Sequence, residues 1–311
     1  MTSDVPSHSE SPSKFNVYAA ITAKIVRAMA ENKGKFEMPW HTSVTPLSVP
    51  INAVSNAVYR GVNILALWAE AAARQYGSAV WASYKQWQSL DAQVRHGERG
   101  TMIIFYRRVE AGVGELDLEL LPRYVSRAYW VFNAAQVENY SAPEMPERTP
   151  VEINDDVESF VKATDARFEH GIPPASYHPD LDVIRMPLPN WFTGSRTRNP
   201  TQAYYAVLLH ELTHWTGAKH RLDRQFGRFG DKSYAFEELI AELGAAFMCA
   251  AFGITNEPRP DHAAYVASWL EVLNNDSRAI FTAAARAQDA IQYLGELAAA
   301  KLDPRPAEEV A

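Results

Sequence analysis

Residues 210–214 read His-Glu-Leu-Thr-His, and this stretch decides how the second half of the chain is interpreted. Residues four apart lie on one face of an α-helix, so His210 and His214 can reach the same metal ion. Glu211 follows the first imidazole, and its carboxylate can act as a general base for a water activated at that ion. The six preceding residues are apolar helix formers, and Gly217 marks the expected helix end. The stretch therefore predicts a site for Zn²⁺, or for another divalent cation, on a buried helix.

Two residues compete for the third ligand position. His220 completes a His-Glu-x-x-His-x-x-Gly-x-x-His spacing that resembles the metzincin peptidases, with Gly217 turning the chain. A metzincin also needs a methionine turn beneath the metal, whereas Met248 lies in an Ala-rich run that predicts a helix. His220 is therefore the weaker candidate.

Glu238 is the preferred third ligand. Residues 237–247 read Glu-Glu-Leu-Ile-Ala-Glu-Leu-Gly-Ala-Ala-Phe and predict a second apolar helix. This run resembles the second motif of gluzincin-type peptidases, in which a Glu ligand is followed one turn later by an acid that supports a ligating His. The resemblance implies that Glu238 binds the metal and that Glu242 supports a histidine. The alternative is a solvated helix face, for which the apolar neighbours leave little room.

Composition limits the class of protein. With 311 residues, 47% of them hydrophobic, the chain has room for two ordinary domains with buried cores. No apolar run reaches the roughly 18 residues of a membrane span, and the Ser-rich start lacks the apolar core of a signal peptide. Cys249 is the single cysteine, which excludes a disulfide framework and indicates a reducing compartment. We expect a cytoplasmic protein without membrane contact.

The net charge of −7 is unevenly distributed. Residues 1–140 carry 14 Lys and Arg against 12 Asp and Glu, or +2, whereas residues 141–311 carry 16 against 25, or −9. Local charge matters more than the total for a polyanionic partner, so any nucleic-acid contact must depend on clusters of basic residues.

A Pro-rich, charged stretch at 141–150 predicts a linker between two domains. The expected organisation is a flexible tail at 1–14, an α+β domain at 15–140, the linker, a mainly helical domain at 151–305 and a tail at 306–311. Residue patterns predict further helices at 15–32, 63–76, 84–90, 155–168, 261–274 and 278–300, and strands at 101–108, 127–132 and 182–187.

Aromatic and basic residues alternate between Trp81 and Arg108. Single-stranded nucleic acid is held by such a combination, because bases stack on exposed rings while Lys and Arg follow the phosphates. The alternative is that the rings belong to a core and the charges solubilise a surface. No zinc finger, basic zipper or clear helix-turn-helix is present, so single-strandedness is the expected cue rather than base sequence. The predicted DNA contacts are Tyr59, Arg60, Trp81, Lys85, Arg95, Arg99 and Arg107.

Several of these segments together resemble ArdC-type antirestriction proteins. The resemblance to the N-terminal domain of that family lies in residues 52–63, 81–86, 94–101 and 131–133. The resemblance to its C-terminal metallopeptidase-like domain lies in residues 210–217, 221–224 and 237–247. The match keeps the same order over nearly the whole chain after about residue 15, so it is more specific than any single motif.

The resemblance implies a plasmid-borne protein in which an α+β domain that binds single-stranded DNA precedes a zincin-like domain of gluzincin type. Its implied role is to shield incoming conjugative DNA from host restriction. The peptidase site would act on a protein or peptide, with components of a restriction system among the candidates. Two alternatives stay open: a DNA-coating protein whose zincin domain is a catalytically silent scaffold, and a DNA-dependent protease of SprT-like type.

Overall fold

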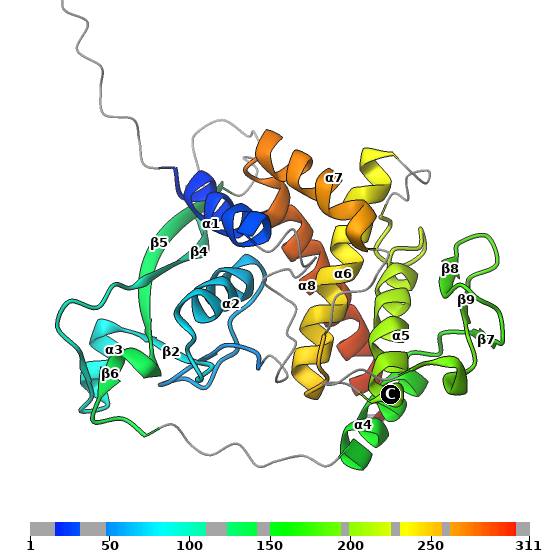
Figure 1. Cartoon of the computed structure of the whole chain (residues 1–311), viewed down its shortest axis with the longest axis horizontal. Helices are drawn as coiled ribbons and strands as arrows, with labels where there is room; N and C mark the ends of the chain where they lie inside the picture. Colours follow the sequence, from blue (N-terminus) through cyan, green and yellow to red (C-terminus); the bar gives the residue numbers. More distant parts are fainter. Residues whose placement is uncertain are drawn as a thin grey trace, which may run out of the picture.

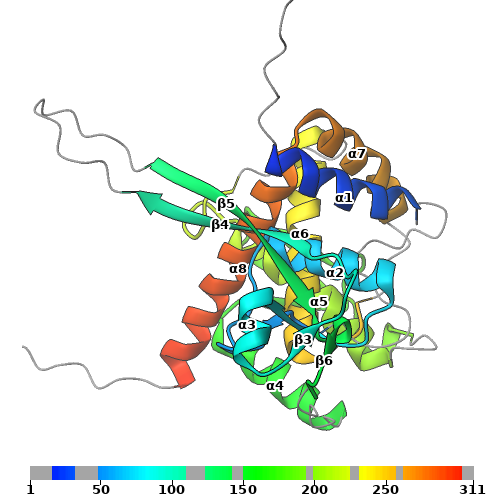
Figure 2. The same ribbon diagram turned by 90° about the vertical axis from the view of Figure 1, so that its left-hand side faces the viewer.

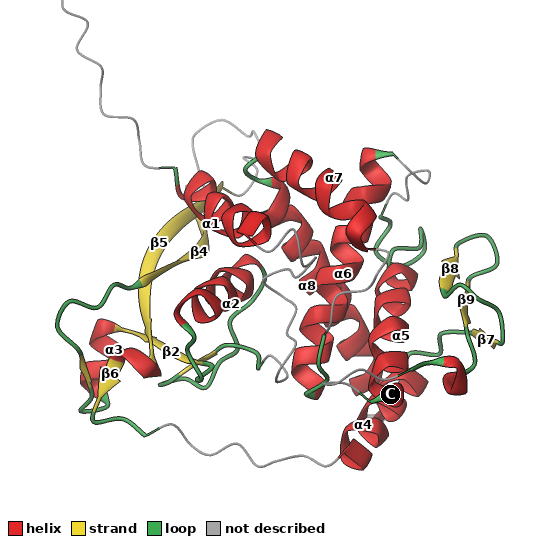
Figure 3. Cartoon of the chain, viewed as in Figure 1, coloured by secondary structure: helices red, strands yellow, loops and turns green. Residues whose placement is uncertain are grey.

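The computed structural model combines helices and strands, with long helices dominating the second part of the chain (Figures 1 and 3). It describes residues 16–31, 48–109, 123–141, 150–193, 199–224, 231–256 and 262–302. The expected tails at 1–14 and 306–311, and most of the expected linker at 141–150, lie outside the described residues. No described helix has the length and apolarity that a membrane crossing requires. The predicted α+β class is confirmed.

The first part is built around a mixed four-stranded sheet. Its strands follow the order β1 (Ile51–Asn52), β2 (Val80–Ser83), β5 (Arg123–Asn133) and β4 (Thr101–Val109). β1 is parallel to β2, and the other neighbours are antiparallel. A two-stranded sheet pairs β3 (Gln93–Val94) with β6 (Val137–Glu138). The helices of this part are α1 (Val17–Glu31), α2 (Val62–Arg74), α3 (Tyr84–Ser89) and the 3₁₀ helix η2 (Ala134–Gln136).

Asn63, in the first turn of α2, ties this helix to the sheet. Its side-chain amide donates to the carbonyl oxygen of Ile104 at 2.8 Å and accepts from the Ile104 backbone N–H at 2.9 Å. β4 is an edge strand in the described sheet, and these backbone groups of Ile104 face away from β5. The Asn63 carboxamide therefore supplies the hydrogen bonds that a further strand would otherwise form. Figure 2 shows β4 and β5 leaving the body as a two-stranded ribbon.

The second part places a small sheet beside a group of helices. The strands follow the order β7 (Phe168–His170), β9 (Val183–Met186) and β8 (Ser176–His178). The helices are α4 (Pro150–Ala163), the 3₁₀ helix η3 (Pro189–Trp191), α5 (Pro200–Thr216), α6 (Lys232–Phe252), α7 (His262–Asn275) and α8 (Ala279–Leu302). α5 begins after Asn199, whose side chain accepts from the Gln202 backbone N–H at 2.8 Å, and ends at Gly217 as predicted.

One apolar core connects the two parts of the chain. It joins side chains of α1, α2, β4, α6, α7 and α8, among them Ile25, Leu65, Ile104, Leu239, Trp269 and Ile280. A second core lies among α4, β9, α5, α6 and α8, and includes Val157, Ile184, Leu209, Met248, Cys249 and Leu294. α6 contributes to both cores, so its position depends on packing from both parts.

The helices and strands predicted from the residue patterns are confirmed within a few residues, apart from α4, which begins and ends five residues before the predicted 155–168. The short strands β1, β2, β3, β6, β7 and β8 were not predicted. The acidic segment at 110–119 lies outside the described residues.

Candidate metal centre

α5 and α6 lie side by side in the second part (Figure 1). Gly244 of α6 faces Thr213 of α5, and a Cβ atom at Gly244 would lie 2.6 Å from the Thr213 Cγ2 atom. Only a residue without a side chain fits at this point, so the two helices approach closely. Thr213 precedes His214 on α5, and Gly244 lies six residues after Glu238 on α6.

The carboxylate of Glu238 lies between the imidazoles of His210 and His214. Glu238 Oε2 is 3.5 Å from Nε2 of His210, and Glu238 Oε1 is 3.5 Å from Nε2 of His214. The imidazole rings are nearly perpendicular, with centroids 4.8 Å apart. One ligand atom from each residue lies within 4.8 Å of the other two. The structure thus brings together the three residues that the sequence favoured as ligands.

These distances fit a divalent cation. Ligands at about 2.0–2.2 Å around a tetrahedral ion are roughly 3.4 Å apart, and here each histidine Nε2 lies 3.5 Å from one oxygen of Glu238. Two imidazoles and one carboxylate match the protein ligands of a catalytic zinc site, which keeps its fourth position for water or substrate. All three side chains are buried.

Glu237 orients His214 through its other ring nitrogen. The Nδ1–H group of His214 donates to Glu237 Oε1 at 3.2 Å. The same carboxylate accepts from the Arg224 guanidinium, through Nη2 at 2.8 Å and Nε at 3.0 Å. Arg224 also donates to the Thr216 hydroxyl at 2.8 Å and to the Thr213 carbonyl oxygen at 2.7 Å. Because Nδ1 is engaged by a carboxylate, Nε2 is the nitrogen that His214 offers to a cation.

Glu242 takes a similar position beside His210. It lies one helical turn after Glu238 on α6, and its Oε2 is 3.7 Å from Nδ1 of His210. Its side chain is buried. Each histidine therefore has one carboxylate near Nδ1 and the Glu238 carboxylate near Nε2, an arrangement that leaves Nε2 of both rings directed at the same point.

The surrounding carboxylates alter the proton affinity of His214. Burial lowers the pKa of His214, but hydrogen bonds and charge interactions with Glu237 and Glu238 outweigh burial and raise the pKa to about 10. Burial likewise raises the pKa of Glu238, but its hydrogen bonds with the two histidines prevail and hold that pKa well below its usual range. A cation that binds Nε2 of His214 must therefore displace a proton.

Tyr234 belongs to the centre although the sequence analysis did not select it. It lies one helical turn before Glu238, and its hydroxyl is hydrogen-bonded to the Glu238 carboxylate. Burial and the nearby Glu238 charge raise the pKa of the Tyr234 hydroxyl, so it remains a proton donor. Its ring packs near Tyr265, which in turn stacks on Trp269. The signal in the sequence was the spacing of four residues to Glu238.

The other predicted residues of this centre fall in different places. Glu211 is buried on α5 beside His210. His220 is exposed, and its Nε2 lies 3.4 Å from Asp182 Oδ2. Met248 lies inside α6 and packs in the second apolar core, not in a turn. The geometry therefore groups Glu238, and not His220, with the two histidines.

Comparison with known proteins identifies the family. A family model described as the N-terminal domain of anti-restriction factor ArdC matches residues 15–137, and one described as a zincin-like metallopeptidase matches residues 155–286. The metal-free crystal structure of the antirestriction protein ArdC from plasmid R388 has a TM-score of 0.74 at 37% identity, over 92% of this chain and 98% of that one. The chain belongs to the ArdC antirestriction family.

A second ArdC structure and two further proteins are similar to most of the chain. The Mn(II)-bound crystal structure of the R388 protein has a TM-score of 0.72 at 35% identity, over 92% of this chain and 99% of that one. "Uncharacterized protein y4eC" of Sinorhizobium fredii is 43% identical over 286 residues, which cover 90% of this chain and 91% of that protein. "DNA primase TraC" of Escherichia coli is 32% identical over 86% of this chain, which spans only 26% of TraC.

The DNA contacts predicted for this ArdC-family chain differ in exposure. Lys85, Arg95 and Arg99 are exposed, and Arg95 Nη2 lies 3.1 Å from Glu98 Oε1. The side chain of Arg107 lies outside the described residues. Trp81 is only 1% exposed and packs in the first apolar core, so no base can stack on it. The prediction that Trp81 contacts DNA is therefore wrong, because β2 turns this ring inward.

Tyr59 and Arg60 lie just before α2. Tyr59 is 6% exposed, and its hydroxyl accepts from the Asn52 side-chain amide at 3.1 Å. Burial raises the pKa of this hydroxyl, so it stays neutral. The neighbouring Arg60 is exposed. Tyr59 therefore supports the shape of this loop, while Arg60 remains accessible to a ligand.

Exposed rings cover part of the ribbon formed by β4 and β5. Phe105 and Trp130 are each 53% exposed, and Tyr129 is 44% exposed. Phe105 meets Tyr129 edge to face at 5.4 Å, and the exposed Arg127 lies opposite Phe105 in the strand register. We call Phe105, Arg127 and Tyr129 the ribbon surface, because the strand register places them on one face of the strand pair. Trp130 is exposed on the opposite face, where Gly100 leaves room for it, because a Cβ atom at Gly100 would lie 2.9 Å from Trp130 Cβ.

Proposed function

We propose that this ArdC-family chain binds single-stranded DNA, protects incoming plasmid DNA from host restriction during conjugation, and carries a metallopeptidase-type active site. The observation that carries the proposal is the presence, in one chain, of a buried His-His-Glu cluster and an exposed aromatic and basic ribbon. Membership of the ArdC antirestriction family supports the biological role.

The ribbon surface supports the DNA-binding half of the proposal. Large rings exposed on a strand pair are unusual for a surface that only meets water. Base-aromatic stacking contributes about 1–3 kcal/mol per base and tolerates any base sequence, because every base has a π-face. Arg127 lies among these rings, and Lys85, Arg95 and Arg99 are exposed elsewhere on the same part of the chain. Together these groups suit a flexible strand whose bases are not paired.

For the metal centre we propose Zn²⁺ as the cation, held by His210, His214 and Glu238. A divalent ion there supplies a Lewis acid and lowers the pKa of water. The related R388 protein was crystallised with Mn(II), but imidazole ligands bind Zn²⁺ more strongly than Mn²⁺. Glu211 takes a proton from the attacking water as general base. The Tyr234 hydroxyl stays neutral and donates to Glu238, so it helps to hold this carboxylate in position for the ion.

A second candidate function is a DNA-coating protein whose metal centre only stabilises the fold. The burial of the centre favours it, since His210, Glu211, His214 and Glu238 are each at most 8% exposed. A peptidase must admit an extended peptide to its metal ligands, so a proteolytic function requires the buried centre to open. A cation that only stabilises the fold requires no such opening. A structural cation would contribute folding free energy without any turnover.

The Glu211→Gln variant distinguishes these functions. It keeps the size of the side chain and all three proposed ligands, so metal content measured after purification should equal that of the wild type. Peptidase activity on an unfolded protein substrate, with and without oligothymidylate, should fall by roughly 10²–10⁴-fold. Glu296→Gln, a change at an exposed site on α8, serves as the matched control.

Restriction protection is measured on the same proteins. Loss of protection in Glu211→Gln alone supports proteolysis as the protective activity, and full protection supports DNA coating. Hydrolysis that requires oligothymidylate identifies a DNA-dependent protease. If the wild type binds no single-stranded DNA and contains no divalent cation, both halves of the proposal fail.

A further inference from the structure

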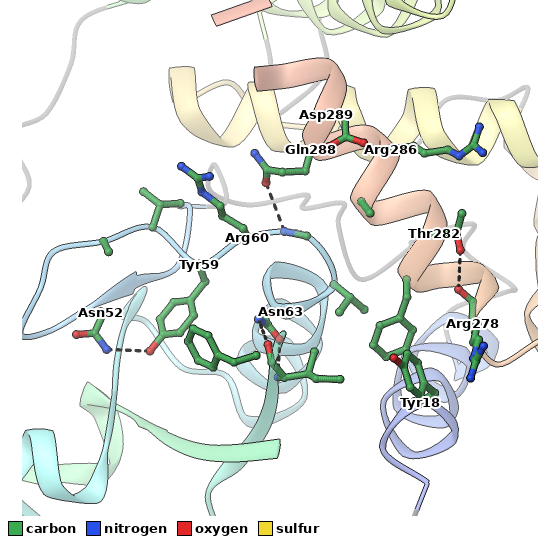
Figure 4. A pocket seen from close by; sticks show the side chains of 18 of the residues that line it. Tyr18, Asn52, Tyr59, Arg60, Asn63, Arg278, Thr282, Arg286, Gln288 and Asp289 are labelled. Atoms are coloured by element: carbon green, nitrogen blue, oxygen red, sulfur yellow. Dashed lines mark hydrogen bonds between the residues drawn. The ribbon is translucent and has the colours of Figure 1, made fainter. Parts of the chain in front are cut away.

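A cavity separate from the metal centre lies between the loop before α2 and one face of α8 (Figure 4). Its volume of about 1070 Å³ exceeds that of most small-molecule sites, which occupy roughly 300–1,000 Å³. One wall includes Asn52, Tyr59 and Arg60, and the opposite wall includes Arg278, Arg286 and Gln288. Residues from the two family domains therefore line one space.

The charge of this cavity contrasts with that of the chain. Arg60, Arg278 and Arg286 line it together with a single carboxylate, Asp289. The chain as a whole has a net charge of −7, yet the cavity collects a surplus of two positive charges. All three arginines are exposed, and within the described part of the chain none of their guanidinium groups forms an ion pair. They are therefore available to an anionic ligand.

The cavity opens toward the ribbon surface. Phe105 lines the cavity, is 53% exposed and contacts Tyr129 on β5. At the other end, the Arg278 guanidinium lies over the Tyr18 ring at 5.1 Å. The side chain of Gln288 also lines the cavity, and its Nε2 group is a hydrogen-bond donor. The Asn52 amide is instead held by Tyr59, Gln86 and the backbone N–H groups of Val54 and Ser55. The combination of guanidinium groups, an accessible ring and an amide matches phosphate, base face and base edge.

A direct hydrogen bond joins the two walls of the cavity. The Gly61 backbone N–H, at the start of α2, donates to Gln288 Oε1 on α8 at 3.4 Å. Gly61 adopts a φ of +56°, which a residue with a side chain rarely adopts. Asn63 holds the same turn to Ile104 on β4. Hydrogen bonds therefore connect the start of α2 to α8 and to β4, the elements that bound the cavity.

We propose that this cavity takes one unstacked nucleotide of single-stranded DNA, with Arg60, Arg278 and Arg286 contacting its flanking phosphates. The strand continues from Phe105 along the ribbon surface. The inference rests on the proposed DNA binding and deepens it, because it assigns α8 of the zincin-like part to the DNA site. A nucleotide in this position contacts both parts of the chain at once.

The test compares two charge-matched double variants of the full-length protein. Arg278→Gln with Arg286→Gln removes two charges from the cavity, while Lys162→Gln with Arg167→Gln removes two exposed charges elsewhere. Affinity for fluorescent oligothymidylate is measured by anisotropy at several salt concentrations. Each lost phosphate contact reduces the slope of log K against log salt by about 0.7 for a single strand. The cavity variant should therefore lose about 1.4 from the slope, and the control should keep the wild-type slope.

A third variant tests occupancy of the cavity without changing charge. Ala285→Trp places a large ring into the space from an exposed position on α8. We expect it to weaken oligothymidylate binding at every salt concentration. If Ala285→Trp binds like the wild type, or if the cavity double variant behaves like its control, the proposed site is wrong even though DNA binding stands. If the wild type itself binds no oligothymidylate, the proposed function fails as well.

Discussion

Three charged side chains, linked by successive contacts, hold the imidazole of His214 in place. Arg224 fixes the Glu237 carboxylate, Glu237 accepts from Nδ1 of His214, and Nε2 then faces Glu238. All of these side chains are buried, so their charges must be balanced locally. The histidine ring therefore has its orientation set before any cation binds, which lowers the cost of binding.

Replacing Glu237 by Gln tests this arrangement. The amide keeps the volume but removes the charge that Arg224 and His214 share, so we expect metal affinity to fall by about 10–100-fold. Metal affinity is measured by competition with a chromophoric chelator, with circular dichroism to verify folding. Glu296→Gln is the control. An unchanged affinity in Glu237→Gln would show that this carboxylate does not support the ligand.

The raised pKa of His214 predicts a pH dependence of metal binding. The folded-state pKa of about 10 lies above the ordinary histidine value of 6.5. The proton on His214 therefore stabilises the metal-free fold fully below pH 6.5, and this contribution is lost as pH rises through about 10. A cation competes with that proton, so between these values its apparent affinity should rise by roughly tenfold per pH unit.

Calorimetry measures the displaced proton directly. At pH 7, titration of the metal-free protein in two buffers with different ionisation enthalpies should show release of about one proton per ion bound. An enthalpy that is the same in both buffers would contradict the protonation state inferred for His214.

Sequence reasoning found the proposed metal ligands in two ways. His210 and His214 have the spacing of one helical turn, whereas Glu238 was favoured because its segment resembles the second gluzincin motif, and the structure brings the three together. The contact of Glu237 with His214 depends on how α6 is rotated against α5, which a single sequence does not contain. Tyr234 has the four-residue spacing to Glu238, but this spacing alone does not assign it to the centre. Trp81 was assigned to DNA because alternating aromatic and basic residues do not reveal which rings face the core.

At the scale of elements, the distance between α5 and α6 depends on Gly244. A Cβ atom at this position would meet the Thr213 side chain at 2.6 and 2.7 Å. Thr213 cannot easily move, because its hydroxyl donates to the Leu209 carbonyl at 2.8 Å and its own carbonyl accepts from Arg224. A side chain added at Gly244 would therefore shift a whole helix, because Thr213 cannot move aside.

Gly244→Ala should consequently separate the helices and damage the metal centre. We expect a loss of about 1–3 kcal/mol in the free energy of unfolding, typical of overpacking, together with weaker metal binding. Urea denaturation of the metal-free and metal-loaded protein measures both effects. Gly295→Ala on α8 is the matched control, because a Cβ atom there meets nothing within 4 Å. Equal stability of the two variants would contradict the close helix contact.

The long elements were predictable and the shortest were not. α2, α7 and α8 have enough turns for apolar spacing to identify them, and β4 and β5 are long β-rich runs. β1, β3 and β6 have two residues each, and they exist only because a remote strand supplies hydrogen-bond partners. Two residues are too few to show the apolar alternation by which a strand is recognised in a sequence.

For the whole molecule, the shared apolar core predicts how the chain unfolds. α1 and α2 pack in the same core as α6, α7 and α8, so neither part keeps its packing when the other unfolds. We expect a single cooperative transition on heating, with tryptophan fluorescence and release of the bound metal changing at the same temperature. Two separate transitions, with metal release confined to one of them, would show that the parts at 15–140 and 151–305 are independent.

The continuity of this core also bears on how the sequence can be inherited. A recombination event between residues 141 and 150 would join halves whose contacting side chains had diverged separately, and it would leave mismatched surfaces between α2 and α8. Selection should therefore transmit both halves as one cassette. The likeness to TraC, which extends over 86% of this chain within a much longer protein, fits a unit that is fused to new neighbours intact.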